Sequence, residues 1–250
     1  MNSPNPAAGT VFLTVFSADL EAACEPIGGL TACLSPAEAQ SARRFARPGD
    51  RLDYLASHAL FRLLAAHRLG RGFAEAPQLE VTRRCTGCGS TGHGKPAIAG
   101  ASLSLSRSKG AVMVAAGPEG TPVGADIEHI PDTLHSAFDQ YVASAAERGA
   151  LAPGDIPARL RLWVAKEAVL KAAGLGLSVP PAEVHLAGDP ANDDDCSTLR
   201  ADSSAHPQVH GLGAVFLPAP PGYAAALSAA GLTSLTRLSL TDLLPPLPAG

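Results

Sequence analysis

Two carboxylates stand two residues apart, Asp126 and Glu128, at the end of an apolar segment that begins at Val123. This segment predicts a β-strand, and residues i and i+2 of a strand project from the same face. Two anions at close range repel each other unless a cation lies between them. Carboxylate oxygens suit Mg²⁺, which takes one or two carboxylates together with waters and substrate phosphates. The alternative is a solvated strand end, which explains most isolated Asp-x-Glu pairs.

A third carboxylate lies in a predicted helix at 155–173. Glu167 and Lys171 are four residues apart and share one face of that helix, and Trp163 stands four residues before Glu167 on the same side. An exposed Glu–Lys pair is the common explanation of this spacing, and such pairs contribute little to stability. This pair, however, stands in an otherwise apolar helix. Together with Lys166 it would complete a site for a magnesium-bound pyrophosphate.

The elements of the first half can be predicted from hydrophobic spacing and turn residues. Residues 10–16 predict a buried strand, Ser35-Pro36-Ala37-Glu38 starts a helix that ends near Pro48, and a longer helix covers 50–69. Further short strands are predicted at 79–82, 103–105, 111–116 and 123–127, the last two joined by a turn at 117–120.

The second half repeats part of this plan. The predicted elements are helices at 135–151 and 155–173, strands at 209–216 and 223–228, an acidic solvated loop at 192–195 and an unstructured end from Leu243. Ser144-x-x-Glu147 before the second long helix echoes Ser35-x-x-Glu38 before the first. We therefore expect two halves of strands and helices, residues 1–118 and 119–232, and a flexible C-terminal tail at 233–250.

The composition excludes several classes of protein. The chain has 250 residues, of which 46% are hydrophobic and 17% charged, and its net charge is −4. This excludes a basic protein that coats nucleic acid and a highly charged disordered chain. No apolar window reaches the ~18 residues of a membrane span, and residues 1–9 lack the features of a signal peptide. The five cysteines are expected to be reduced thiols, so we predict a soluble cytoplasmic protein.

One cysteine motif indicates a different chemistry. Cys85, Cys88 and His93 provide three of the four ligands of a structural zinc site. No fourth ligand stands nearby in the sequence, because Cys24, Cys33 and Cys196 are all distant. We therefore expect a glycine-rich loop with reduced thiols, and structural zinc is the alternative.

Four motifs in register resemble the Sfp-type 4′-phosphopantetheinyl transferase family. The first two are Val123-Gly124-Ala125-Asp126-Ile127-Glu128 and Trp163-x-x-Lys166-Glu167-x-x-x-Lys171. Upstream, Gly94-Lys95-Pro96 is similar to the family's Gly-Lys-Pro segment, and Ser104-Leu105-Ser106-Arg107-Ser108 takes the place of its Asn-x-Ser-His-Ser segment. The resemblance runs in order from about residue 10 to residue 230.

The resemblance implies an α+β fold of two pseudo-symmetric α/β halves with the active site in the cleft between them. Enzymes of this family transfer 4′-phosphopantetheine from coenzyme A to a serine of an apo acyl or peptidyl carrier protein and release adenosine 3′,5′-bisphosphate. By this resemblance, Asp126, Glu128 and Glu167 would hold Mg²⁺ or Mn²⁺. Glu167 would also help to deprotonate the carrier serine, and Lys171 would offset charge on the transferred phosphate.

Coenzyme A is the expected substrate, and its nucleotide is expected against the N-terminal half. The residues expected to contact it are Arg43, Arg44, Lys95, Pro96, Ser106, Arg107, Lys166 and Lys171. The resemblance implies a monomer that activates carrier domains of polyketide, nonribosomal peptide or fatty-acid synthesis. No nucleic-acid or membrane partner is expected.

Four positions depart from the family pattern, and one of them, Ala125 in place of the usual branched residue, is tolerable. Arg107 replaces the usual histidine, which is compatible with a retained phosphate contact or with a changed ligand. Glu38 and Ser41 stand where the family often carries lysines that meet the 3′-phosphate. Arg43 and Arg44 lie one turn further and either substitute for these lysines or form a solvated face. The alternative function is therefore a repurposed member that binds a carrier protein or another nucleotide without this transfer.

Overall fold

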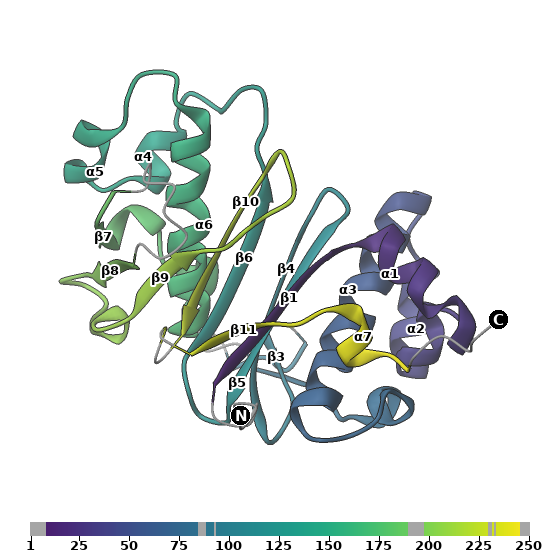
Figure 1. The fold of residues 1–250 in the computed structure, drawn as a ribbon. Helices are drawn as coiled ribbons and strands as arrows, with labels where there is room; N and C mark the ends of the chain where they lie inside the picture. Colours follow the sequence, from purple (N-terminus) through teal and green to yellow (C-terminus); the bar gives the residue numbers. More distant parts are fainter. Residues whose placement is uncertain are drawn as a thin grey trace, which may run out of the picture. The chain divides into compact units, whose positions relative to one another are not determined.

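The computed structural model describes residues 9–84, 89–92, 94–189, 198–229, 232 and 234–245. Contacts within the chain divide it into two units (Figure 1). The first unit comprises residues 1–82, 96–120 and 234–250, and the second comprises residues 83–95 and 121–233. The chain passes from the first unit to the second after Gly120, and residues 83–95, which lie within the half predicted at 1–118, belong to the second unit.

The first unit is a four-stranded sheet covered by helices. Its strands are β1 (Thr10–Phe16), β4 (Ala101–Ser108), β5 (Ala111–Pro118) and β11 (Leu235–Arg237), arranged in the order β11-β1-β5-β4. Its helices are α1 (Ser17–Cys24), α2 (Pro36–Ala42), α3 (Pro48–Arg68) and α7 (Leu240–Leu243). Helix α3 packs on β4 and β5, and its buried leucines, Leu60, Leu63 and Leu64, form the centre of this core.

The second unit is a five-stranded sheet against one long helix. Its strands are β6 (Val123–His129), β7 (His185–Ala187), β8 (Thr198–Asp202), β9 (Gly213–Phe216) and β10 (Tyr223–Ala229), arranged in the order β6-β10-β9-β8-β7. Its helices are α4 (Phe138–Val142), α5 (Ala145–Ala150) and α6 (Ile156–Ala172), and α6 packs on β6, β10 and β9. Asp155 caps the start of α6, and Gly174, with a φ of +74°, follows its end.

The remaining elements are short. A separate ladder pairs β2 (Thr82–Arg84) with β3 (Lys95–Ala97). Single 3₁₀ turns cover Glu25–Ile27, Leu30–Cys33, Phe73–Gln78, Gly176–Ser178, Pro181–Glu183 and Pro207–Val209. No helix in the described part of the chain is long and apolar enough to cross a membrane.

The two units share an order of elements. In the first, β1 is followed by helices and then by the antiparallel hairpin β4–β5, and β5 pairs antiparallel with β1. In the second, β6 is followed by helices and later by the antiparallel pair β9–β10, and β10 pairs antiparallel with β6. Both Ser-x-x-Glu motifs, Ser35 with Glu38 and Ser144 with Glu147, form capping boxes at the start of a helix.

The predicted flexible tail at 233–250 is wrong for the residues that the structure describes there. Strand β11 pairs in parallel with β1, and the backbone N–H of Leu238 donates to the carbonyl of Phe12 at 2.8 Å. Leu238, Leu243 and Leu244 are buried in the first unit's core. The segment is ordered because these leucines bury apolar surface that a proline-rich end does not suggest.

Several element boundaries also differ from the prediction. The helix that begins after Ser35 ends at Ala42, six residues before Pro48, and the predicted helix at 135–151 is two short helices, α4 and α5. The strand predicted at 209–216 begins at Gly213. Strand β4 extends to Ser108, so Arg107 lies on the strand, two residues beyond the predicted end at residue 105.

Candidate active site

Strand β6 passes very close to the last two turns of helix α6, and Gly124 makes this approach feasible. A Cβ atom at position 124 would collide with the carbonyl of Ala168 and the backbone nitrogen of Ala172. Glycine in a strand often marks such a close backbone approach. The sequence signal Val-Gly-x-Asp-x-Glu therefore fixes where the strand that carries the carboxylates meets the helix that carries Glu167 and Lys171.

Asp126 and Lys171 form an ion pair across this contact. Asp126 is 2% exposed, and its Oδ1 accepts a hydrogen bond from Lys171 Nζ at 2.6 Å. Lys171 Nζ also donates to the carbonyl of Ala125 at 3.2 Å, and its side chain is 24% exposed. The structure thus brings together two predicted site residues that are 45 positions apart in the sequence.

Glu167 is the least satisfied carboxyl of the site. It is 5% exposed, and within the described ranges its Oε1 is buried without a hydrogen-bond partner. Burial raises its pKa to about 7, the charges of Asp126 and Glu128 add to the rise, and Lys171 opposes it. Near neutral pH this carboxyl is therefore divided between its acid and carboxylate forms, as expected for a group that exchanges protons.

Glu128 lies on the same face of β6 as Asp126. Residues directly opposite each other in an antiparallel pair share a face, and the residues opposite Glu128 and Asp126 on β10 are Ala224 and Ala226. Glu128 is half-buried. The residues directly opposite the two carboxylates thus carry only methyl side chains.

The donor set fits a hard cation. Among the described residues, no group of three or more His, Cys, Asp or Glu side chains is arranged so that it could hold a metal ion, so Asp126, Glu128 and Glu167 do not form such a group as they stand. Mg²⁺ does not need one, because it is usually held by one or two carboxylates together with substrate phosphates and several waters. Glu167 Oε1, buried without a hydrogen-bond partner in the described ranges, and Asp126 supply such carboxylate oxygens. A cation would offset the burial and the carboxylate repulsion that together raise the pKa of Glu167.

Lys95 lies beside this site, but its ammonium is bound to backbone. Its Nζ donates to the carbonyl of Val123 at 2.7 Å and to that of Lys171 at 3.0 Å. The residue as a whole is exposed, yet the ammonium end is desolvated. Desolvation and the nearby charge of Lys171 lower the pKa of Lys95 to about 8.

The structure contradicts the predicted phosphate contact of Lys166. The side chain is fully buried, and its Nζ donates to Glu147 Oε2 at 2.5 Å and to the carbonyls of Val142 at 2.7 Å and Pro181 at 3.1 Å. An ammonium has three N–H donors, and all three are used here. Burial lowers the pKa of Lys166, and Glu147 opposes this shift. Lys166 therefore stabilises the second unit and cannot reach a ligand.

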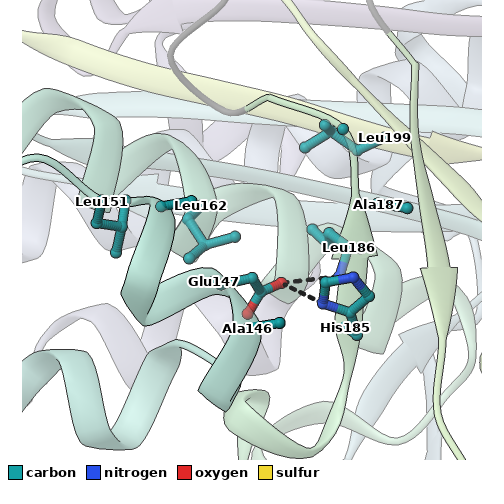
Figure 2. A pocket seen from close by; sticks show the side chains of 10 residues that line it. Ala146, Glu147, Leu151, Leu162, His185, Leu186, Ala187 and Leu199 are labelled. Carbon is teal, nitrogen blue, oxygen red and sulfur yellow. Dashed lines mark hydrogen bonds and ion pairs between the residues drawn. The ribbon is translucent and has the colours of Figure 1, made fainter.

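Glu147, which the sequence singled out only as part of a repeated Ser-x-x-Glu motif, is the centre of this buried cluster. It also accepts the N–H groups of Ser144 at 2.6 Å and Leu186 at 2.8 Å. Glu147 lines a cavity of about 330 Å³, and its Oε1 lies 3.6 Å from His185 Nδ1. Figure 2 shows these two side chains facing each other. The rest of that cavity is lined by alanine, leucine and glycine residues. Its one carboxylate is committed to the fold, so the cavity offers little chemistry.

An equivalent cluster, also missed from sequence, lies in the first unit. Glu38 accepts hydrogen bonds from Arg62 Nε at 2.6 Å and Ser35 Oγ at 2.8 Å, and its Oε1 lies 2.9 Å from His58 Nδ1. Arg62 is 3% exposed and also donates to the carbonyls of Ala76 and Leu79. The sequence feature that could have indicated both clusters is the Ser-x-x-Glu motif before each long helix. Glu38 is therefore a structural residue.

The predicted nucleotide contacts of the first unit are distributed over several elements. Arg107 is exposed on β4, donates to Ser57 Oγ at 2.9 Å and lies over the Tyr54 ring at 5.9 Å. Ser106 is buried on the same strand. Pro96 is half-buried on β3, and Arg43 and Arg44 are exposed in the turn after α2. The zinc motif Cys85, Cys88 and His93 lies outside the described residues.

Residues 122–228 match the family model of the 4′-phosphopantetheinyl transferase superfamily. The matched segment contains β6, α6 and β10, and with them Asp126, Glu128, Glu167 and Lys171. A comparison with curated proteins gives no match. The family match supports a transferase that acts on phosphopantetheine, and it covers the part of the chain in which the carboxylate site lies.

Proposed function

We propose that this protein is an Sfp-type, Mg²⁺-dependent enzyme that transfers 4′-phosphopantetheine from coenzyme A to a serine of an apo carrier protein. The observation that carries the proposal is Glu167. It is a buried carboxyl with a pKa of about 7, next to the Asp126–Lys171 ion pair, inside the segment that matches the superfamily.

The residues have distinct roles in this reaction. The carrier serine oxygen forms a bond to the β-phosphorus of coenzyme A, and the bond between this phosphorus and the bridging oxygen of the pyrophosphate breaks. Adenosine 3′,5′-bisphosphate leaves with that bond's electron pair. Glu167, in its carboxylate form, accepts the serine proton directly or through a water. Lys171 supplies positive charge to the transferred phosphate, and its hydrogen bonds to Asp126 and Ala125 hold its ammonium in place.

Asp126, Glu128 and Glu167 are the residues that would hold Mg²⁺. A bound divalent cation would supply charge neutralisation at the pyrophosphate. The chain's own contribution is to keep Asp126 and Glu167 nearly buried, because low solvent exposure strengthens their interaction with a cation.

The first unit is proposed to bind the nucleotide of coenzyme A. Arg107 is an exposed cation next to the ring of Tyr54. Arg43 and Arg44 remain candidates because both are exposed. The shared order of elements and the two Ser-x-x-Glu clusters support an interpretation of the units as pseudo-symmetric halves.

The direct test is to incubate the protein with coenzyme A, Mg²⁺ and a panel of apo acyl and peptidyl carrier proteins. We expect the intact mass of at least one carrier to increase by one phosphopantetheine, and EDTA to abolish the increase. Asp126→Ala should lower turnover by two orders of magnitude or more, because removing a metal ligand forfeits about 3 kcal/mol or more of charge stabilisation.

The matched control is Asp132→Ala, which removes an exposed carboxylate from the loop after β6. This control should retain wild-type turnover, and both variants should keep wild-type circular dichroism. Near-normal transfer by Asp126→Ala or Glu167→Ala would show that the site is assigned wrongly. Coenzyme A binding without transfer to any carrier would favour the repurposed family member.

A further inference from the structure

The ammonium of Lys95 joins the two elements that carry the carboxylate site. Val123, whose carbonyl it binds at 2.7 Å, is the first residue of β6, and Lys171, whose carbonyl it binds at 3.0 Å, lies in the last turn of α6. Both acceptors belong to the second unit, as does Lys95. The contact is therefore internal to the unit that holds Asp126, Glu167 and Lys171.

The end of α6 is a favourable place for this cation. The last carbonyls of a helix lack intrahelical donors and carry the negative end of the helix dipole. The carbonyl of Lys171 receives the N–H of Gly174 at 3.2 Å and the ammonium of Lys95. Lys95 thus helps to cap the turn from which the Lys171 side chain extends.

Three consecutive residues of β6 are held to α6 just before Asp126. The carbonyl of Val123 is joined to the helix end through Lys95, Gly124 lies against the helix backbone, and the carbonyl of Ala125 accepts from Lys171 Nζ at 3.2 Å. These contacts fix the position of β6 along the axis of α6. That position sets the distances among the catalytic side chains.

We propose that Lys95 is a positioning residue for the transfer reaction, which holds β6 against the last turn of α6 and thereby keeps Asp126, Glu167 and Lys171 in place. The inference rests on the proposed function and replaces the expected phosphate contact of Lys95. Two of the three N–H donors of its ammonium are already bound to carbonyls. A lysine that has lost its charge keeps two N–H donors, which is enough for both carbonyl contacts of Lys95. A contact with a phosphate would weaken, because it depends on the positive charge.

The test compares Lys95→Met and Lys95→Gln with wild type in steady-state transfer and in amide hydrogen exchange without coenzyme A. Lys95→Met should lower kcat at least about tenfold, because displacement of catalytic groups by about 1 Å can cost up to about a hundredfold. The KM for coenzyme A should change less than twofold. Exchange should accelerate in peptides covering β6 and the last turn of α6. Lys95→Gln, which keeps N–H donors but no charge, should recover part of both losses.

Arg200→Met is the matched control, because it removes an exposed cation from β8 in the same unit. It should leave kcat, KM and exchange unchanged. The proposal would be overturned in favour of a phosphate contact if both Lys95 variants raised the KM for coenzyme A to the same extent and left kcat and hydrogen exchange unchanged. If wild type transfers to no carrier, the proposed function fails, and unchanged exchange in Lys95→Met would separately refute the positioning role. If Lys95→Met does not fold, the kinetic and hydrogen-exchange measurements on Lys95→Gln test the proposal.

Discussion

Among the residues that the structure describes, buried charged groups differ in how fully they are hydrogen-bonded, and this difference separates candidates for substrate contact from groups that stabilise the fold. Lys166 uses every donor of its ammonium on Glu147 and two carbonyls, and Arg62 is similarly bound to Glu38 and backbone. Glu167, in contrast, is buried with a raised pKa and, among the described residues, an oxygen without a hydrogen-bond partner. A buried polar group that the fold leaves unsatisfied is a candidate for ligand binding, whereas a saturated one stabilises the fold.

The Glu38 cluster predicts an acid-sensitive contribution to stability. Burial opposes ionisation of Glu38, but the hydrogen bonds from His58, Arg62 and Ser35 outweigh it and lower the pKa to about 2. A pKa below the unfolded value of 4.5 means that the stabilisation is fully present above pH 4.5 and is lost as the pH falls towards 2. Glu38→Gln should therefore cost roughly 3 kcal/mol at pH 7, with the difference from wild type shrinking below pH 4.5.

Urea unfolding between pH 3 and pH 7 measures this effect. Gln at position 38 can still close the capping box, so the variant isolates the charge. Glu21→Gln, an exposed position on α1, should change stability little at any of these pH values. A Glu38→Gln penalty that is independent of pH would show that the carboxylate charge is not what stabilises the cluster.

Arg107 predicts a selective loss of coenzyme A affinity. Arg107 is exposed, and its guanidinium donates to Ser57 and lies over the ring of Tyr54. If it binds a phosphate of coenzyme A, Arg107→Ala should raise KM more than it lowers kcat, because the contact is made in ground and transition states alike. A charge-assisted contact of about 1.5–3 kcal/mol corresponds to a tenfold or larger effect.

Dephospho-coenzyme A, which lacks the 3′-phosphate, identifies the group involved. A much smaller effect of Arg107→Ala with this donor assigns the contact to the 3′-phosphate, and equal losses with both donors assign it to the pyrophosphate or the carrier. Arg51→Ala, at an exposed position on α3, serves as the control. Unchanged kinetics of Arg107→Ala with both donors would remove Arg107 from the binding site.

At the scale of elements, the contact between β6 and α6 depends on Gly124 having no side chain. Gly124→Ala would place a methyl group against the backbone of Ala168 and Ala172, and neither backbone atom can move like the end of a flexible side chain. We expect a loss of roughly 3 kcal/mol or more in stability, because overpacking against a fixed backbone forces the elements apart. Transfer activity should fall even where the variant remains folded.

Gly149→Ala is the matched control for this prediction. Gly149 lies in α5 of the same unit, and a Cβ there meets no atom within 4 Å. Alanine at that position should stabilise the helix by up to about 1 kcal/mol. Thermal unfolding of both variants checks the contrast, and equal melting temperatures would contradict the importance of the close approach.

The sequence predicts elements better than it predicts which charged groups are buried. Strand β6 and helix α6 follow from hydrophobic spacing, and so does the shared face of Glu167 and Lys171. The role of Lys166 does not, because its neighbour Glu147 is 19 residues away, in a helix of only six residues. Strands β7 and β8 are missed because three to five residues are too few to show a period.

At the scale of the whole chain, each unit is built from more than one sequence segment. Residues 234–250 belong to the first unit. The backbone N–H of Thr10 donates to the carbonyl of Ser234 at 3.0 Å, and β11 then extends the sheet beside β1. Pairing between the two ends of a chain cannot be read from local patterns. For this reason, the proline-rich C-terminal sequence predicted a tail where the structure has a strand and a short helix.

Removal of the C-terminal segment is therefore expected to destabilise the first unit and not the second. A chain that ends at residue 233 loses β11 and the buried leucines Leu238, Leu243 and Leu244, and it exposes the edge of β1. Each buried leucine contributes about 2–5 kcal/mol, so the first unit should be destabilised by roughly 5 kcal/mol or more. Hydrogen exchange should accelerate throughout β1 and α3, because α7 packs on α3. It should change little in β10 and α6, whereas a chain that ends after Pro245 should behave as wild type. Equal exchange in the two truncated proteins would mean that β11 and its leucines do not support the first unit.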